Sequence, residues 1–111
     1  MTPTAKITVG GAKRRVTLNA TIDTGFDGDV CIPADTAVTL GLDLIDQIEV
    51  ELADGSRNRE LVFGGFAVFL GKKRMVEILL TEGDETLVGT NLMSDCKLAV
   101  DFRAEKVALT R

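Results

Sequence analysis

The sequence predicts an all-β fold of many short strands with one short helix. Apolar and polar residues alternate along several segments, which is the period of a half-buried strand. Val16, Leu18, Ala20 and Ile22, for example, alternate with polar neighbours. Turn residues separate these segments, a pattern typical of barrels and sandwiches. With 111 residues, the chain is long enough for one domain with one core.

Recognisable turns separate the expected strands. Gly10-Gly11 joins the first two strands in a hairpin, Ala53-Asp54-Gly55-Ser56 is a strong hairpin turn, and Gly71 begins another turn. Gly64-Gly65 predicts a bend or bulge inside a strand. The segments expected to be strands are residues 7–9, 15–22, 30–32, 48–52, 59–63, 66–70, 75–80, 87–89, 97–102 and 106–110.

One helix is expected at about residues 34–40. Pro33 suits a first helical turn, Asp35 complements the positive end of the helix dipole, and Gly41 suits the C-terminal cap. The segment near residues 91–95 is compatible with a single helical turn.

Composition narrows the classes of function. The chain is 45% hydrophobic and 27% charged, a globular balance that argues against disorder. Its net charge of −4 argues against a nucleic-acid partner. The two basic clusters, Lys13-Arg14-Arg15 and Lys72-Lys73-Arg74, each follow a glycine. We interpret them as solvated hairpin turns rather than a phosphate-binding patch.

No segment is long and apolar enough to be a membrane span, and the first residues lack the apolar core of a signal peptide. Two cysteines are too few for a disulfide scaffold and favour a reducing compartment, so a cytoplasmic location is expected. Cys31 lies in an apolar run and is interpreted as a small core residue. A disulfide between Cys31 and Cys96 remains open at this point.

The chain contains no histidine. This excludes Ser-His and Cys-His catalysis and any imidazole-ligated zinc, and two cysteines alone make a poor zinc site. No metal and no cofactor are therefore expected. Seventeen acidic residues make carboxylates the natural candidates for chemistry.

The strongest candidate is Asp23. An apolar, β-branched run leads into Asp23-Thr24-Gly25, so a buried strand would hold this carboxylate at its tip. Gly25 allows a sharp turn there, and burial and hydrogen bonds can tune a carboxylate in such a place. The tripeptide alone is also typical of an ordinary turn after a strand.

Spacing changes this interpretation. The glycine hairpin at Asp54-Gly55 follows Asp23, and an apolar-apolar-glycine segment, Leu87-Val88-Gly89, comes later in the chain. In this order the sequence resembles the retropepsin-like (clan AA) aspartic proteases, and its small single-domain prokaryotic members most of all. The resemblance runs from about residue 7 to residue 109 and is carried by Asp23-Thr24-Gly25, Gly28 to Pro33, Leu40-Gly41-Leu42, Ala53-Asp54-Gly55 and Leu87-Val88-Gly89-Thr90-Asn91-Leu92.

The resemblance implies a closed acid-protease-like β-barrel formed by residues 1–111 as a single domain. It implies an aspartic endopeptidase with Asp23 as the catalytic residue, supported by Thr24 and Gly25. Phe26 would lie in the substrate cleft. The remaining implied roles are a flap formed by Ala53, Asp54 and Gly55, and loop packing by Leu87, Val88 and Gly89.

The mechanism of this family needs two carboxylates that share one proton, and the chain has one good copy of the motif. Asp35-Thr36-Ala37 is the only near-repeat, and it falls in the expected helix. The resemblance therefore implies a symmetric homodimer acting on a peptide or protein substrate. Its terminal strands, residues 2–9 and 107–111, would interleave at the interface.

Two residues depart from the family pattern. Phe26 follows the Asp-Thr-Gly motif where many members have a small residue or a hydroxyl, and Thr90 replaces an arginine of the viral members. The flap has one glycine and no tyrosine. These departures motivate an alternative, a catalytically weak or inactive dimerisation or peptide-binding domain on the same barrel.

Overall fold

The computed structural model describes residues 1–111, and strands make up most of it. The all-β class predicted from the alternation is confirmed. The elements follow in the order β1 (Thr4–Gly10), β2 (Arg15–Ile22), β3 (Val30–Pro33), α1 (Ala34–Leu40), β4 (Asp43–Glu51), β5 (Arg57–Phe69), β6 (Lys72–Thr81), β7 (Leu87–Val88), β8 (Lys97–Asp101) and β9 (Lys106–Thr110).

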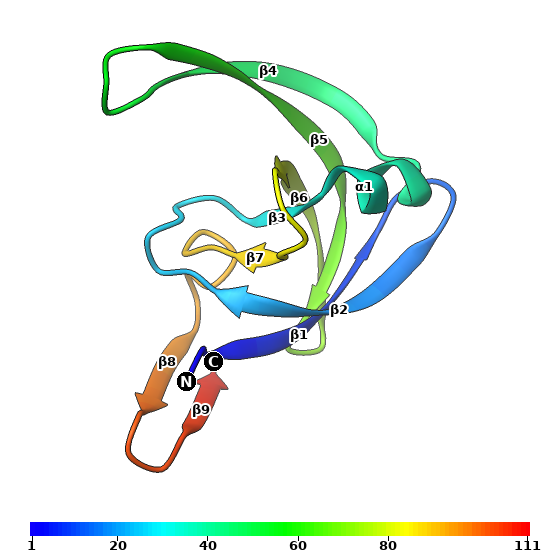
Figure 1. Ribbon diagram of the computed structural model, residues 1–111. Coiled ribbons are helices and arrows are strands. Elements are labelled where there is room, and N and C mark those ends of the chain that lie inside the picture. The colour runs from blue at the N-terminus through cyan, green and yellow to red at the C-terminus, as the bar shows by residue number, and fades with distance from the viewer.

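Six strands close into a barrel in the order β1, β2, β7, β3, β6, β5 and back to β1 (Figure 1). The closure is uneven. β5 and β6 share eight residue pairs, whereas β1 and β5 share three, and β7 shares two with each neighbour. β7 nevertheless lies between β2 and β3 in the sheet and pairs with both. The loop that joins β2 to β3 along the chain therefore begins and ends beside β7.

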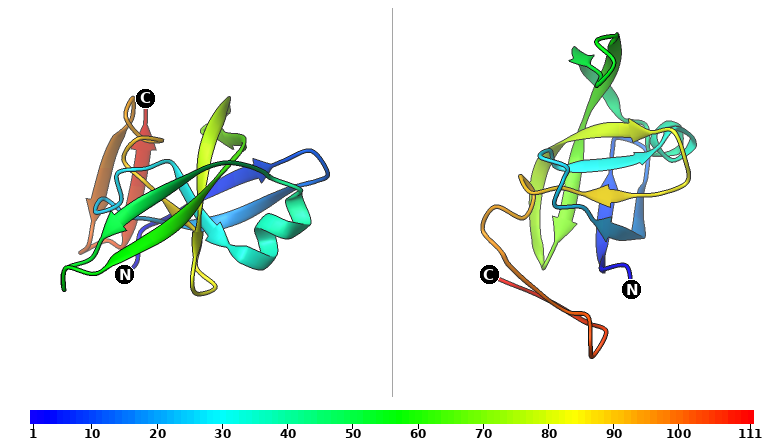
Figure 2. Two further views of the ribbon diagram at one scale, coloured as in Figure 1. Left: turned by 90° about the horizontal axis from the view of Figure 1, so that it is seen from above. Right: turned by 60° about the vertical axis from the view of Figure 1, so that its left-hand side comes forward.

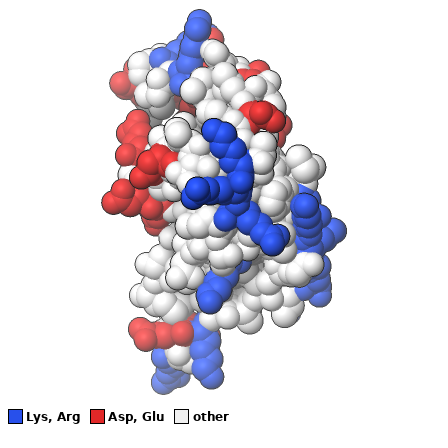
Figure 3. Space-filling view, turned by 90° about the vertical axis from the view of Figure 1, so that its right-hand side faces the viewer, with Lys and Arg blue, Asp and Glu red and all other residues white.

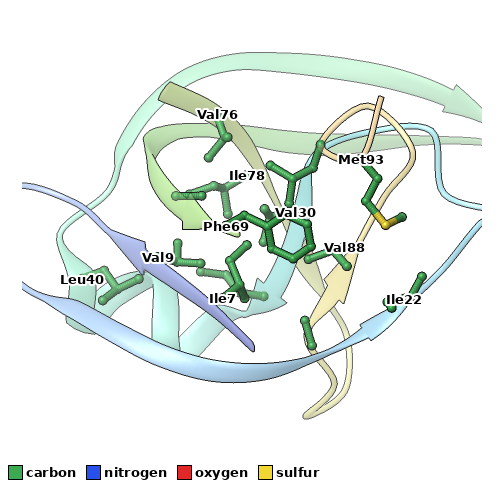
Figure 4. Close-up of a cluster of buried hydrophobic side chains, with 14 of the residues drawn as sticks. Ile7, Val9, Ile22, Val30, Leu40, Phe69, Val76, Ile78, Val88 and Met93 are labelled. Carbon is green, nitrogen blue, oxygen red and sulfur yellow. The ribbon is translucent and has the colours of Figure 1, made fainter. Parts of the chain in front are cut away.

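The barrel encloses one apolar core (Figure 4). Phe69 lies at its centre with Ile7, Ile78 and Val88, each at most 1% exposed. Fully burying such side chains contributes about 1.5–3 kcal/mol each, before the entropy of ordering the chain is subtracted. The core therefore fixes the barrel strands from which the loops project.

Helix α1 has the residue bounds that the sequence predicts. It buries Ala37 and Leu40 against the core, and Gly41 ends it with a left-handed φ of 67°. Pro33 differs from the expectation, because it is the N-cap with extended backbone rather than a residue of the first turn.

β4 and β5 form a long hairpin that extends beyond the barrel (Figure 1). The predicted bulge at Gly64-Gly65 is wrong, since β5 pairs with β6 without interruption there. The irregularity lies in the facing strand, between Leu44 and Asp46. Gly64 accommodates it, because a Cβ at that position would meet Ile45 Cγ2 at 3.2 Å.

The apolar side chains of β4 are not buried within the chain. Ile48 is 38% exposed and Ile45 is 56% exposed. The apolar side chains whose alternation predicts this strand therefore do not belong to the barrel core.

Residues 90–95 form successive turns and no assigned helix. One hydrogen bond, from Met93 N to Gly89 O at 3.3 Å, has the spacing of an α-helical turn. Arg74 of β6 also donates to the carbonyl of Leu92, so this basic residue ties the turns to the barrel.

The two basic clusters lie beside turns rather than wholly within them, which corrects the prediction: Arg15 begins β2, and Lys72-Lys73-Arg74 are part of β6. Lys13 and Arg14 are exposed between β1 and β2, and Lys72 and Lys73 begin β6. The turn before β6 is Leu70-Gly71, one residue earlier than expected, and both residues have positive φ. Figure 3 shows basic side chains in several separate groups on one face.

The β8–β9 hairpin is a separate two-stranded sheet that projects away from the barrel (Figures 1 and 2). Leu98, Val107 and Leu109 pack against the edge of the core. Arg111 attaches its end to the β5–β6 turn, donating to Leu70 O at 2.6 Å and to Phe69 O at 2.8 Å.

Asp95 completes this attachment. Its carboxylate accepts from Arg111 Nε at 3.2 Å and lies 3.7 Å from Lys72 Nζ. The pKa of Asp95 is lowered, chiefly by a hydrogen bond from the Cys96 thiol and further by Arg111.

No helix of the structure is long and apolar enough to cross a membrane.

Arg111→Ala should loosen the β8–β9 hairpin without unfolding the barrel. Two charge-assisted hydrogen bonds to backbone are lost, and solvent moderates their contribution, so we expect hairpin amides to exchange about three- to tenfold faster. Hydrogen exchange with mass spectrometry measures this. Arg103→Ala, in the exposed β8–β9 turn, is the matched control. Equal exchange in the two variants would contradict the role of Arg111.

Candidate active site

The candidate site forms where β2, β7 and β3 meet. β7 pairs in parallel with β2, Ile22 facing Val88, and antiparallel with β3, Val30 facing Val88. Asp23 continues this pairing by donating its N–H to Val88 O at 3.0 Å. The strand-to-loop transition after Ile22 is therefore held by the core-facing Val88.

Asp23 lies at the tip of β2, as the sequence predicts. Its side chain is partly buried, and Oδ1 accepts a hydrogen bond from Gly25 N at 2.9 Å. Phe26 N donates to Asp23 O at 3.2 Å and closes the turn. Thr24 is exposed at its apex. This arrangement leaves the second carboxylate oxygen without a partner in the chain and offers both a negative charge and an acceptor at the surface.

Gly89 brings the end of β7 against the loop of residues 23–29. Its N–H donates to Asp29 O at 2.9 Å, and the next two N–H groups donate to Phe26 O and Gly28 O at 2.9 and 3.1 Å. A Cβ on Gly89 would lie 2.7 Å from both Phe26 O and Phe26 Cδ2. Only glycine fits this contact without moving the loop.

The side chain of Phe26 packs against two glycines of this contact. Its ring lies over Gly28, where a Cβ would meet Cζ at 2.6 Å, and beside Gly89. The ring also forms part of the wall of a cavity of about 310 Å³ whose lining does not include Asp23. The two glycines therefore make the space that an aromatic side chain needs directly after the Asp-Thr-Gly turn.

Asp29 is a residue of this loop that the sequence analysis does not single out. Its carboxylate accepts from Asn91 Nδ2 at 2.7 Å and from Glu77 N at 3.1 Å. It thus joins the loop, the turns after β7 and strand β6.

The predicted flap residues Ala53, Asp54 and Gly55 are exposed at the tip of the β4–β5 hairpin. Gly55 has a φ of 85°, and Ser56 donates from both its hydroxyl and its N–H to Asp54 Oδ1. The Ser56 side chain is the main reason that the pKa of Asp54 is lowered. No hydrogen bond connects this tip to the loop of Asp23, so the structure does not join the two parts within one chain.

Cys31 lies behind the loop, in β3 next to β7, and is 8% exposed. Burial raises the pKa of its thiol to about 11, and the nearby charges of Glu60 and Asp23 add to the effect. Both cysteines are free thiols, which answers the question of their pairing for this structure. No group of three or more Cys, Asp or Glu side chains is arranged to hold a metal ion.

This barrel, with a loop delivered by β2 and closed by β7, is the fold of the retroviral proteases. The chain is similar to the simian foamy virus protease in solution, with a TM-score of 0.63 and 18% identity over 83% of this chain and 92% of that one. It is also similar to the EIAV protease in complex with the inhibitor HBY-793, with a TM-score of 0.61 and 16% identity over 86% and 88%. Neither a family model nor a curated protein matches the sequence.

Gly89→Ala should destabilise the protein, because the methyl group would collide with backbone and ring atoms of Phe26. Overpacking of this kind costs about 1–3 kcal/mol of unfolding free energy. Gly83→Ala is the matched control, since a Cβ there meets nothing within 4 Å. Urea unfolding measures both, and equal midpoints would contradict the close approach at Gly89.

Cys31 should resist alkylation while the protein is folded. Burial and a raised pKa protect the Cys31 thiol at pH 8. The pKa of the Cys96 thiol is raised as well, by burial and by Asp95, so the contrast rests on the greater accessibility of Cys96. We expect iodoacetamide to modify Cys96 at least about tenfold faster, as read by mass spectrometry of peptides. In urea the two rates should converge. Faster modification of Cys31 in the folded protein would show that β3 is open.

Proposed function

We propose that residues 1–111 form one retropepsin-like domain of the small prokaryotic type, and that it acts as a homodimeric aspartic endopeptidase. Asp23 from each chain would supply one carboxylate of the catalytic dyad. The two free thiols agree with a reducing, cytoplasmic environment, which we include in the proposal.

One observation carries this proposal: a partly buried Asp23 at the tip of a barrel strand, in the fold of the retroviral proteases. The carboxylate is positioned by Gly25 N through Oδ1 and by backbone pairing to Val88. Such a carboxylate has the fixed geometry that acid–base catalysis requires.

The chemistry follows from two such groups meeting. Two carboxylates a few ångströms apart cannot both ionise readily, so they share one proton and titrate as a unit. The ionised member takes a proton from water, which attacks the peptide carbonyl, while the protonated member donates a hydrogen bond to the carbonyl oxygen. Thr24, exposed beside Asp23, is available to brace the partner loop.

A second chain is needed because this chain contains one Asp-Thr-Gly motif. The near-repeat Asp35-Thr36-Ala37 lies within α1 and cannot form the second loop. Symmetry then requires that both Asp23 loops lie at the twofold axis.

The terminal strands are candidates for the dimer interface. The β8–β9 hairpin does not pair with the barrel sheet, and an isolated two-stranded sheet has little stability of its own. β1 pairs with β5 only over Thr8–Gly10, which leaves its edge free near residues 4–7. These edges agree with the expected interleaving of residues 2–9 and 107–111.

The alternative is a catalytically weak or inactive dimerisation or peptide-binding domain. The observation that favours it is Phe26, which offers no hydroxyl to the Asp23 carboxylate. The ring packs against Gly28 and Gly89 and lines a cavity whose lining does not include Asp23, which supports the enzyme as the first candidate.

Asp23→Asn should abolish peptide hydrolysis while the fold is retained. Loss of the acid–base group should lower kcat by at least about 10²–10⁴-fold. Mass spectrometry of a peptide library measures cleavage, and circular dichroism checks the fold. Asp84→Asn, in an exposed loop, is the matched control. Unchanged hydrolysis by the Asp23→Asn protein would eliminate the proposal.

Mixing the two proteins tests the shared site within the same experiment. If each active site needs two Asp23 residues, an equilibrated equal mixture should retain roughly a quarter of the activity of wild type at the same total concentration. Retention of half would mean that each chain acts alone. Sedimentation velocity supplies the oligomeric state independently.

A further inference from the structure

A cavity of about 310 Å³ lies directly beside the loop of Asp23, between residues 26–29, the base of the β4–β5 hairpin and β6. Its apolar wall includes Phe26, Ile48, Val62 and Leu79. The volume falls at the lower end of the range typical of ligand sites. Ile48 belongs to the face of β4 that the core does not bury, and here it forms part of the apolar wall of the cavity.

The polar part of the same cavity has a single sign of charge. Asp27, Asp29, Asp46 and Glu77 all contribute to its lining, and no Lys or Arg does. The three ion pairs of the structure join Arg57 to Glu49 and Asp95 to Lys72 and Arg111, all outside the cavity. No cation of this chain therefore neutralises it.

The hydrogen bonds separate these carboxylates into two kinds. Asp29 is committed to Asn91 and Glu77 N, and Asp46 accepts from Gln47 N at 2.8 Å. The side chains of Asp27 and Glu77 make no hydrogen bond within the chain. They stand on the loop and on β6 respectively, and both remain available to an external donor.

We propose that this cavity binds a lysine or arginine side chain of the peptide substrate, and so makes the protein selective for a cationic residue near the bond it cleaves. The methylene stem would pack along Ile48, Val62 and Leu79, as long basic side chains do on apolar surface. The head group would meet the charges of Asp27 and Glu77, next to the ring of Phe26. The peptide substrate is taken from the proposed function, whereas the charge preference comes from the cavity alone.

The preference has a clear physical order. A neutral side chain of the same length gains the apolar contact but not the charge interaction. A glutamate at the same position meets like charge in a partly enclosed space and is disfavoured. The electrostatic part should weaken as salt is added.

The test compares peptides that differ at one position in turn, carrying arginine, lysine, glutamine, norleucine or glutamate. At the two positions that face the two copies of the cavity, one on each side of the cleaved bond, arginine and lysine should raise kcat/KM at least about fivefold over glutamine and norleucine, with glutamate lowest. Glu77→Gln should reduce this ratio, and Glu77→Lys should invert the preference towards glutamate. Glu82→Gln, in an exposed loop outside the cavity, should leave the ratio unchanged.

Binding separates this inference from the proposed function. The same peptides, fluorescently labelled, are titrated onto the Asp23→Asn protein, whose binding does not require catalysis. Tighter binding of arginine peptides that Glu77→Lys reverses supports the cavity even if the wild-type protein cleaves nothing. Cleavage or binding that is indifferent to the charge at every position, or no peptide binding at all, would overturn it.

Discussion

Gly89 approaches the backbone of residues 26–29 so closely that three consecutive N–H groups, from Gly89 to Asn91, donate to carbonyls of that loop. A hydrogen bond of this kind contributes about 0.5–1.5 kcal/mol net to stability. Together the three hydrogen bonds anchor the loop that carries Asp23 to the end of β7. The ring of Phe26, the acceptors for Asn91 and the start of β3 all depend on this contact.

Asp29 extends the same constraint in a second direction. Through Asn91 it reaches the turns after β7, and through Glu77 N it reaches the middle of β6. Arg74, three residues before Glu77 in β6, donates to the carbonyl of Leu92 and so contacts the same turns at a second point. The hydrogen bonds of Asp29 and Arg74 thus hold the loop of residues 23–29 and the turns after β7 against β6.

Local pattern was enough to predict most of the fold. Alternation in residues 15–22, the Asp54-Gly55 turn and the Pro33 and Gly41 boundaries of α1 each depend on a few neighbouring residues, and each corresponds to an element of the structure. The bulge was misplaced because Gly64 accommodates an irregularity on the facing strand, and pairing partners are not encoded locally. The place of Asp23 at a strand tip was predictable. The role of Asp29 was not predictable, because its partners Asn91 and Glu77 lie 62 and 48 residues away along the chain.

The packing of Phe26 over Gly28 and beside Gly89 has a consequence for how such a chain can change over time. In the homodimer that we propose, every loop would occur twice, so one codon change in this loop would alter both sides of the cleft at once. A peptide has no twofold symmetry and presents different side chains to the two copies. Adaptation to a new sequence on one flank is then coupled to a change on the other, until gene duplication and fusion allow the two halves to diverge.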